Sequence, residues 1–517
     1  MTIPGRDKVD RRIPDWALLA TVFITGACVL VIELIGTRIL APYFGSGIYT
    51  WSALIAVTLA ALALGYAFGG RLADRLPRAD ILYNLCLAAG LWTLSTPMLA
   101  GPLLPVMSQI ADIRMGVLLS SLCLYFPNLF LLGAVGPFVI RLMTREREAV
   151  GSVSGRVFAV STIGSLLGAL CTGFVLIPNV GVLAIFAFCG SLLLALAILG
   201  NFRPKFIGFT FLLLIPVAVM LATVDRPAPD ASVKLLAQTP SYYGNIQVIR
   251  KQNQKSLLVD GIGQNYVYDD GRFSTGYINF IAALPQIIPA ETRANNNALV
   301  IGLGAGQLPM RLQELGFHVE AVEIDPKIGD IARQHFGFDL PEEQLHYTDG
   351  RVFLLRAGRT YEYIVIDAFS AEQVAAHLVT LQAFTQASAR LSDTGVLAIN
   401  ITSSIDGEDV AALENTLKAV FPHVRSFSPG LEGELASIVM LASRSPIHLA
   451  IDRSPPGTPQ TRDVKRFAAG ELTGLNSDVL LTDDYNPVAF QRRQVQLMWR
   501  KLMIDYLGED NLDWLSL

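Results

Sequence analysis

The chain has 517 residues, enough for two or three domains, and 52% of them are hydrophobic whereas only 16% are charged. With a mean hydropathy of +0.45, the chain is too apolar for an ordinary soluble enzyme. The formal net charge of -4 gives no reason to expect nucleic acid as a partner.

Apolar segments that are long enough to cross a bilayer occupy most of residues 16–223. We expect seven transmembrane helices, at 16–40, 49–70, 81–101, 115–140, 153–177, 182–200 and 206–223. The first segment is not a cleaved signal peptide, because it is too long and further spans follow it. The five cysteines lie in this part without zinc-type spacing or a disulfide framework, so we expect no metal. The sequence therefore predicts a multi-span α-helical membrane domain over residues 1–225.

Basic residues mark alternate ends of these segments. They precede the first segment and follow the second, fourth and sixth, and the intervening loops are almost free of Lys and Arg. The positive-inside rule then places the N-terminus in the cytoplasm, in a multi-pass protein of the cell (inner) membrane. The basic residues are Arg6, Lys8, Arg11, Arg12, Arg71, Arg75, Arg78, Arg141, Arg145, Arg147, Arg203 and Lys205.

Charged residues also occur within the membrane part. Glu33 and Arg38 lie inside or at the edge of the first segment, where charge is costly and often functional; the alternative is a structural ion pair. The stretch Gly69-Gly-Arg-Leu-Ala-Asp74-Arg75 resembles the loop after the second helix of major-facilitator transporters. Small-residue helix faces allow close packing and are compatible with a homodimer.

The composition changes near residue 225. Residues 226–230 form a short linker with two prolines, and alternating segments at 246–250 and 256–260 are separated by a polar turn. This pattern is typical of an antiparallel hairpin. We therefore expect a linker and a small β-hairpin subdomain over residues 226–290, with a helix near 273–284.

A glycine-rich stretch follows the apolar strand at 298–301. Here the chain must turn sharply and let a ligand approach the bare backbone. A second strand, at 318–324, ends in Glu323, and an acid at that place in a βαβ unit can hold the two hydroxyls of a ribose. The spacing predicts a nucleoside cofactor and is compatible with both a nicotinamide dinucleotide and S-adenosylmethionine. The glycines are Gly302, Gly304 and Gly306.

Strands and helices continue to alternate up to residue 401. We expect helices at 327–335, 352–355 and 380–391, and strands at 345–348, 361–366 and 395–401. This alternation predicts a doubly wound parallel sheet with helices on both faces, in an α/β, Rossmann-type domain over residues 291–517. Ligands of such sheets lie at the carboxyl ends of the strands, where Glu323, Asp349 and Asp367 occur.

These motifs resemble the spermidine synthase (polyamine aminopropyltransferase) family, which has a methyltransferase-like fold after a β-rich N-terminal domain. The whole chain looks like the membrane-fused branch, in which a multi-span segment precedes the synthase-like domain. The resemblance implies a transferase of polyamine biosynthesis. It rests on the glycine loop, Val322-Glu-Ile-Asp325, Asp349-Gly350, Tyr363-Ile-Val-Ile-Asp367, Asp367-Ala-Phe-Ser370, His377-Leu378 with Thr380, and Leu481-Thr-Asp-Asp-Tyr-Asn-Pro487.

The resemblance implies that S-adenosylmethionine or its decarboxylated form is the co-substrate. In this picture Glu323 holds the ribose hydroxyls and Asp349 accepts from the adenine amino group. The backbone of the glycine loop approaches the sulfonium side of the nucleoside. The implied nucleoside-binding residues are Gly302, Gly304, Gly306, Glu323, Ile324, Asp349 and Gly350.

Asp367 matches the family acid that takes a proton from the attacking amine, which cannot act as a nucleophile while it is protonated. The chain departs from the family at Ser370, where soluble spermidine synthases usually carry a second acid that helps to hold the diamine. A dication binds less well without that carboxylate, so putrescine is the expected acceptor by resemblance alone. The implied residues of the nucleoside and amine pocket are Tyr242, Tyr243, Asp260, Gln264, Ser370, His377, Asp483 and Asp484.

Three functions follow from these observations. The first is a membrane-bound aminopropyltransferase that releases methylthioadenosine and transfers the aminopropyl group to an amine such as putrescine. The second, motivated by Ser370, is a lyase-like cleavage of S-adenosylmethionine to methylthioadenosine without an amine acceptor. The third, motivated by Glu33, Arg38 and the transporter-like stretch at 69–75, is a nucleoside-regulated transporter or sensor.

The side of the membrane that carries the C-terminal domain stays open. Seven crossings from a cytoplasmic N-terminus would place residues after 225 outside the cell. Adenosyl cofactors, however, are made and kept inside cells, which favours the cytoplasm.

Overall fold

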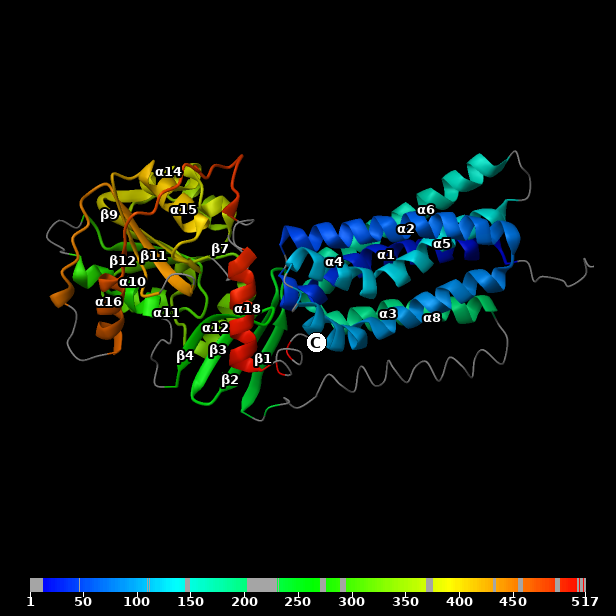
Figure 1. The fold of residues 1–517 in the computed structure, drawn as a ribbon, viewed down its shortest axis with the longest axis horizontal. Coiled ribbons are helices and arrows are strands. Elements are labelled where there is room, and N and C mark those ends of the chain that lie inside the picture. Colours follow the sequence, from blue (N-terminus) through cyan, green and yellow to red (C-terminus); the bar gives the residue numbers. More distant parts are fainter. Residues whose placement is uncertain are drawn as a thin grey trace, which may run out of the picture. The chain divides into compact units, whose positions relative to one another are not determined.

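The computed structural model describes residues 13–45, 47–108, 110, 112–144, 149–201, 230, 232–269, 276–288, 294–368, 375–430, 434–453, 459–488, 493–508, 511 and 515. The chain divides into a helical unit, made of residues 1–44, 48–226 and 517, and an α/β unit, made of residues 45–47 and 227–516. The colours of Figure 1 separate them, because the helical unit is drawn in blue to blue-green and the α/β unit in green to red.

Long apolar helices make up the helical unit (Figure 1). They are α1 (Asp15–Phe44), α2 (Ile48–Arg75), α3 (Ala79–Ser108), α4 (Ile113–Leu124), α5 (Phe126–Met143), α6 (Val150–Cys171), α7 (Ile177–Asn179) and α8 (Val182–Asn201), with a π-helical turn, Thr172–Leu176, between α6 and α7. Within the described residues, six helical stretches are long and apolar enough to cross a membrane. The seventh predicted helix, at 206–223, lies outside the described residues.

The structure divides the predicted helix at 115–140 into α4 and α5 at Tyr125. Pro127, in the first turn of α5, has no backbone N–H to donate to the preceding turn. At the same break, the carbonyl oxygen of Leu124, the last residue of α4, accepts a hydrogen bond from the indole Nε1 of Trp92 over 2.8 Å. The prediction of one unbroken helix is therefore wrong, because a proline interrupts an otherwise apolar run.

Glycines allow the helices of this unit to approach one another closely. A Cβ atom at Gly69 of α2 would lie 2.5 Å from the Cα of Ala134 in α5. A Cβ atom at Gly164 of α6 would lie 2.2 Å from the carbonyl oxygen of Phe23 in α1. Any larger residue would push these helix pairs apart, so the small residues determine how closely the backbones pack.

The α/β unit begins with a four-stranded antiparallel sheet in the order β1-β2-β3-β4. The strands are β1 (Val233–Pro240), β2 (Asn245–Lys251), β3 (Gln254–Val259) and β4 (Ile262–Tyr268). The predicted hairpin corresponds to β2 and β3, at the centre of this sheet. Helix α18 (Arg493–Leu507) covers one face, where Met503 and Leu507 pack with Ile249 and Leu258. The other face joins the core of the larger sheet.

The larger sheet has eight strands in the order β12-β10-β11-β9-β8-β5-β6-β7. Strands β5 to β9 pair in parallel, as predicted, whereas β11, β10 and β12 pair antiparallel at one edge. This antiparallel edge lies beyond residue 401, where the predicted alternation of strands and helices ends, and β10 and β11 follow one another without the crossover helix that a parallel pair requires. The strands are β5 (Asn297–Ile301), β6 (His318–Glu323), β7 (Leu345–Tyr347), β8 (Tyr361–Ile366), β9 (Leu391–Ser404), β10 (His423–Phe427), β11 (Leu435–Ser443) and β12 (Glu471–Leu472).

Helices cover both faces of this sheet, which confirms the Rossmann-type fold (Figure 1). Side chains alternate along β5, so that Ala298 and Val300 face one core and Leu299 and Ile301 face the other. Helices α10 (Gly276–Ile287), α11 (Gln307–Glu314), α12 (Pro326–Phe336) and α16 (Pro459–Ala469) contribute to the first core. Helices α13 (Gly350–Arg356), α14 (Leu381–Arg390) and α15 (Glu408–Lys418) contribute to the second.

The strand order fixes where a ligand can bind. The chain leaves β5 toward β6 on one side and returns to β8 on the other side of β5. At such a reversal the connections diverge and leave a crevice beyond the carboxyl ends of the strands.

Candidate active site

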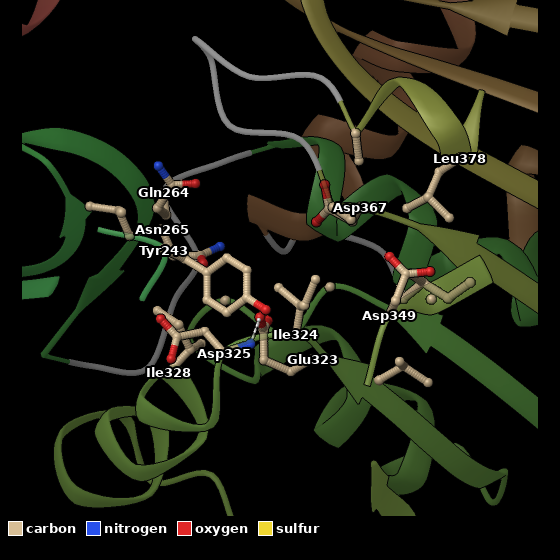
Figure 2. Close-up of a pocket in the computed structure, with 18 of the residues that line it drawn as sticks. Tyr243, Gln264, Asn265, Glu323, Ile324, Asp325, Ile328, Asp349, Asp367 and Leu378 are labelled. Atoms are coloured by element: carbon tan, nitrogen blue, oxygen red, sulfur yellow. Dashed lines mark hydrogen bonds between the residues drawn. The ribbon is translucent and has the colours of Figure 1, made fainter. Parts of the chain in front are cut away.

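A pocket of about 480 Å³ lies in the α/β unit beyond the ends of these strands (Figure 2). Its wall includes the end of the four-stranded sheet, the glycine loop after β5 and the ends of β6, β7 and β8. The structure brings together eleven of the residues predicted from the sequence: Tyr243, Asp260, Gln264, Gly302, Gly304, Glu323, Ile324, Asp349, Gly350, Asp367 and His377.

Five predicted site residues are not among those that line this pocket. Ser370 lies outside the described residues. Gly306 is the residue before α11, in a left-handed conformation, where a Cβ atom would lie 2.5 Å from the ring of Phe338. Tyr242, Asp483 and Asp484 also do not line the pocket.

The glycine loop is confined on two sides. Gly302 has a φ of +96°, and a Cβ atom there would lie 2.3 Å from the carbonyl oxygen of Asp367. Gly304 has a φ of +53°, and a Cβ atom there would lie 2.0 Å from Oδ1 of Asn265. The same Asn265 oxygen accepts a hydrogen bond from the backbone N–H of Ala305 over 2.9 Å. The loop therefore fits between β4 and the end of β8 only with glycine at both positions.

Glu323 supports this loop from the end of β6. Its carboxylate accepts hydrogen bonds from the backbone N–H of Leu303 and from that of Asp325, each over 3.0 Å. Burial raises the pKa of Glu323, although these N–H groups oppose the shift. Each carboxylate oxygen has a second lone pair, so Glu323 can still accept a ligand hydroxyl.

Asp349 caps α13 with one oxygen and contacts His377 with the other. Its Oδ1 accepts from the backbone N–H groups of Arg351 and Val352, and its Oδ2 lies 2.7 Å from Nε2 of His377. Burial alone would raise the pKa of Asp349, but the Val352 N–H and His377 outweigh it, so the pKa is lowered. Asp349 is therefore an anion at neutral pH.

An ion pair outside the pocket holds this part of the wall. Both terminal nitrogens of Arg351 donate to the two carboxylate oxygens of Asp483 over 2.6 Å. Arg351 also donates to the carbonyl oxygen of His377 over 3.1 Å, and Asn486 donates to that of Ala376 over 2.8 Å. Asp483 therefore supports the pocket indirectly. Through Arg351 it fixes the segment that carries His377 beside Asp349.

Asp367 lies at the end of β8, buried in the pocket wall. Its Oδ1 accepts from Nδ2 of Asn400 over 2.9 Å and its Oδ2 accepts from the hydroxyl of Tyr277 over 3.0 Å. Burial raises the pKa of Asp367 to about 6, although both donors oppose the shift. A carboxylate of that pKa is ionised at neutral pH and basic enough to accept a proton from a bound ligand.

Sequence reasoning missed the side chains that hold these groups. Tyr277 lies in the first turn of an apolar, largely buried helix, where an aromatic residue is usually part of the core. Asn265 follows the predicted Gln264. Asn400 is a polar residue within an apolar strand, near its carboxyl end. The strand-end rule that selected Asp367 would also have found Asn400.

The pocket is strongly negative. Five carboxylates line it, those of Asp260, Glu323, Asp325, Asp349 and Asp367, and the described lining contains no Lys or Arg. Burial raises the pKa of Tyr243, and the charges of Asp325, Asp349 and Glu323 raise it further. In Figure 2 the Tyr243 side chain points into the pocket that these carboxylates line. Such a pocket favours cationic ligands and repels anionic ones.

We expect Gly304→Ala to weaken binding of methylthioadenosine at least about tenfold, because the new methyl group collides with Asn265 and the backbone φ is unfavourable for alanine. Calorimetric titration of the full chain in detergent measures the dissociation constant. Gly358→Ala is the matched control, since a Cβ atom there meets nothing within 4 Å. Equal affinities for the two variants would contradict the account of the loop.

We expect Asp483→Asn to weaken methylthioadenosine binding about three- to tenfold, because the neutral amide loses the bidentate pair with Arg351 and frees the His377 segment. The same change at the neighbouring Asp484 serves as the control in the same titration. If the Asp484 variant were the weaker binder, Asp484 and not Asp483 would be the residue that supports the pocket.

Several known proteins are similar to this chain. No protein-family model matches the chain. A polyamine aminopropyltransferase of Vibrio vulnificus is 35% identical over 238 residues, which cover 43% of this chain and 78% of that protein. A polyamine aminopropyltransferase of Corynebacterium efficiens is 26% identical over 444 residues, which cover 77% of this chain and 79% of that protein. That share exceeds the α/β unit, so the second match extends into the helical unit.

Two solved structures are also similar. A probable spermidine synthase of Corynebacterium glutamicum is 15% identical, with a TM-score of 0.38 over 51% of this chain and 93% of that one. The spermidine synthase of Thermotoga maritima is 17% identical, with a TM-score of 0.35 over 48% of this chain and 81% of that one. The identity with the Vibrio vulnificus protein, over more than three quarters of its length, decides the assignment. The chain is a transferase and belongs to the polyamine aminopropyltransferase family.

Proposed function

We propose that this chain is a membrane-anchored aminopropyltransferase. It transfers the aminopropyl group of decarboxylated S-adenosylmethionine to an amine such as putrescine and releases methylthioadenosine. The observation that carries the proposal is the buried carboxylate of Asp367, with a pKa of about 6, in the wall of a pocket rich in carboxylates.

The charge of the pocket supports this choice of donor. A nicotinamide dinucleotide would bring a diphosphate among five carboxylates, whereas a sulfonium nucleoside brings a positive charge. S-adenosylmethionine itself carries a further carboxylate, for which the described lining offers no Lys or Arg. The decarboxylated form lacks that group, and this difference favours aminopropyl transfer over cleavage of S-adenosylmethionine.

Different carboxylates bind different parts of the nucleoside. Glu323 already holds the glycine loop and has free lone pairs for the ribose hydroxyls. Asp349 is held ionised beside His377 and accepts from the adenine amino group. Ile324, which is 42% exposed although apolar, offers a surface for the adenine ring.

Asp367 acts on the amine. Its carboxylate takes a proton from the ammonium group, and the freed nitrogen lone pair attacks the aminopropyl carbon next to sulfur. A carbon–nitrogen bond forms, the carbon–sulfur bond breaks, and its electron pair stays on sulfur, which leaves as the neutral thioether. Tyr277 and Asn400 keep the carboxylate in one orientation throughout.

The membrane anchor is the helical unit, whose described part contains six stretches suited to crossing a bilayer. From a cytoplasmic N-terminus, six crossings would return the chain to the cytoplasm, where adenosyl donors are made. A seventh crossing at 206–223 would place the α/β unit outside.

We expect Asp367→Asn to lower turnover at least about a hundredfold, because the amide cannot accept the proton, while methylthioadenosine affinity changes less than about threefold. Chromatography measures methylthioadenosine formed from decarboxylated S-adenosylmethionine by the full chain, with and without putrescine. Asp463→Asn is the matched control, since Asp463 pairs with Asn279 outside the pocket.

Two results would contradict the proposal. Full turnover of the Asp367 variant would remove this carboxylate from the mechanism. Methylthioadenosine released by the unaltered chain from S-adenosylmethionine, without any amine, would instead support the cleavage reaction.

We expect kcat/KM to increase with pH in a transition whose midpoint is near pH 6. Only ionised Asp367 can accept the proton, and its pKa is about 6. Tyr277→Phe removes a donor that stabilises the anion, so the pKa rises and the midpoint moves to higher pH by roughly half to one pH unit. Tyr266→Phe, which removes a hydroxyl that does not contact Asp367, should leave the midpoint in place. A midpoint that both variants share would contradict this role of Tyr277.

A further inference from the structure

A second group of polar side chains lies inside the helical unit, away from the pocket. Its position follows from a hydrogen bond between α1 and the α4–α5 pair: the hydroxyl of Tyr125, which is fully buried, donates to the carbonyl oxygen of Gly36 over 3.2 Å. This bond fixes which parts of the two helices lie at the same level.

Helices α1 and α5 run in opposite directions. Leu18 and Val22, near the start of α1, share a core with Val139 and Met143, near the end of α5. Glu33 precedes Gly36 by three residues and lies on the same face of α1.

Asn128 lies three residues after Tyr125 on α5, and Glu33 lies three residues before Gly36 on α1. Because the two helices are antiparallel and Tyr125 bonds to Gly36, Asn128 and Glu33 lie at about the same level. Glu33 is half-buried and lies about 27 Å from the start of a helix of about 45 Å. The carboxylate is therefore well inside the span.

Helices α2 and α3 add two more polar residues to this level. On α2, Leu54 lies close to Gly36, and Gly65 packs on Phe130 of α5. Thr58 lies between Leu54 and Gly65 on the buried face of α2, next to the same part of α1 and α5.

On α3, the hydroxyl of Thr93 accepts a hydrogen bond from Nδ2 of Asn128 over 3.0 Å. Four helices thus each place one polar residue at one level. We call Glu33, Thr58, Thr93 and Asn128 the polar layer.

Two oxygens of the polar layer are buried without a hydrogen-bond partner in the described part of the chain. They are Oδ1 of Asn128, a residue that is 1% exposed, and Oγ1 of Thr58, which is 3% exposed. An unpaired buried polar atom destabilises the fold, and a carboxylate within a span does so more unless it meets a positive charge. The polar layer therefore presents a carboxylate and two further acceptor oxygens to a ligand that brings charge and donors.

We propose that the polar layer is a second binding site of the chain, for a primary ammonium group. An ammonium has one positive charge and three N–H donors, which match the Glu33 carboxylate, Asn128 Oδ1 and Thr58 Oγ1. The choice of an amine rests on the proposed function, because aminopropyl transfer consumes one amine and produces another. The helical unit thereby binds the class of compound on which the α/β unit acts.

The test measures equilibrium binding of radiolabelled putrescine to the full chain in lipid nanodiscs. Asp367→Asn is the parent, so that the pocket of the α/β unit contributes less to the signal. We expect Glu33→Gln to weaken the remaining binding at least about tenfold, because the charge is lost in a medium of low dielectric constant.

Thr58→Val should weaken the binding about threefold or more. Thr25→Val is its matched control: the Thr25 hydroxyl already donates to Thr21 within α1, so this variant should bind as the parent does.

Each outcome decides the proposal. Undiminished putrescine binding by both the Glu33 and the Thr58 variant, each eluting as a single species and still binding methylthioadenosine, would overturn it. Weakening by Thr25→Val equal to that by Thr58→Val would also overturn it. Binding that depends on Glu33, in a chain that forms no methylthioadenosine from any donor, would support the second site while contradicting the proposed function.

Discussion

Asp367 can remain in the wall of the pocket only because two donors hold it. Burial disfavours the anion and raises the pKa of Asp367, and the hydrogen bonds from the two donors oppose that rise. The hydroxyl of Tyr277 and the amide of Asn400 each donate a hydrogen bond to one carboxylate oxygen. The anion therefore persists at neutral pH while its basicity stays high. These three residues come from α10, β9 and the end of β8. The reactive group therefore exists only when the helix and the parallel strands are packed together.

The other carboxylates of the pocket serve the fold as well as the ligand. Glu323 holds the backbone of the glycine loop, and Asp349 caps α13. Each uses only part of its hydrogen-bonding capacity for the backbone and keeps lone pairs that face the pocket. The chain thus concentrates negative charge at one sheet edge without leaving the anions unsatisfied, and this charge selects a cationic nucleoside.

The sequence predicted those parts of the site that depend on local pattern. Apolar strands followed by glycines or acids mark the ends of β5, β6 and β8, and the strand-end rule brings them together without any knowledge of side-chain contacts. Tyr277, Asn265 and Asn400 could not be recognised in this way, because their roles depend on contacts between distant segments. Asp483 shows the same limit, since its partner Arg351 lies 132 residues away.

Two features of the fold that the sequence did not predict have local physical causes. Pro127 divides an apolar run that hydropathy alone describes as one helix. The antiparallel edge of the large sheet lies beyond the alternating strands and helices, and it arises from the short connection between β10 and β11. In the helical unit, hydropathy marks the apolar segments, but it does not say which polar residues share a level.

The central claim is that Asp367 is buried with a raised pKa in the folded chain. Infrared difference spectra between the chain and its Asp367→Asn variant, recorded as the pH is raised, observe this carboxyl group directly. The account predicts a protonated carboxyl band at low pH that gives way to a carboxylate band with a midpoint near 6. A carboxyl group that is already ionised at about pH 5, as an exposed aspartate would be, would contradict it.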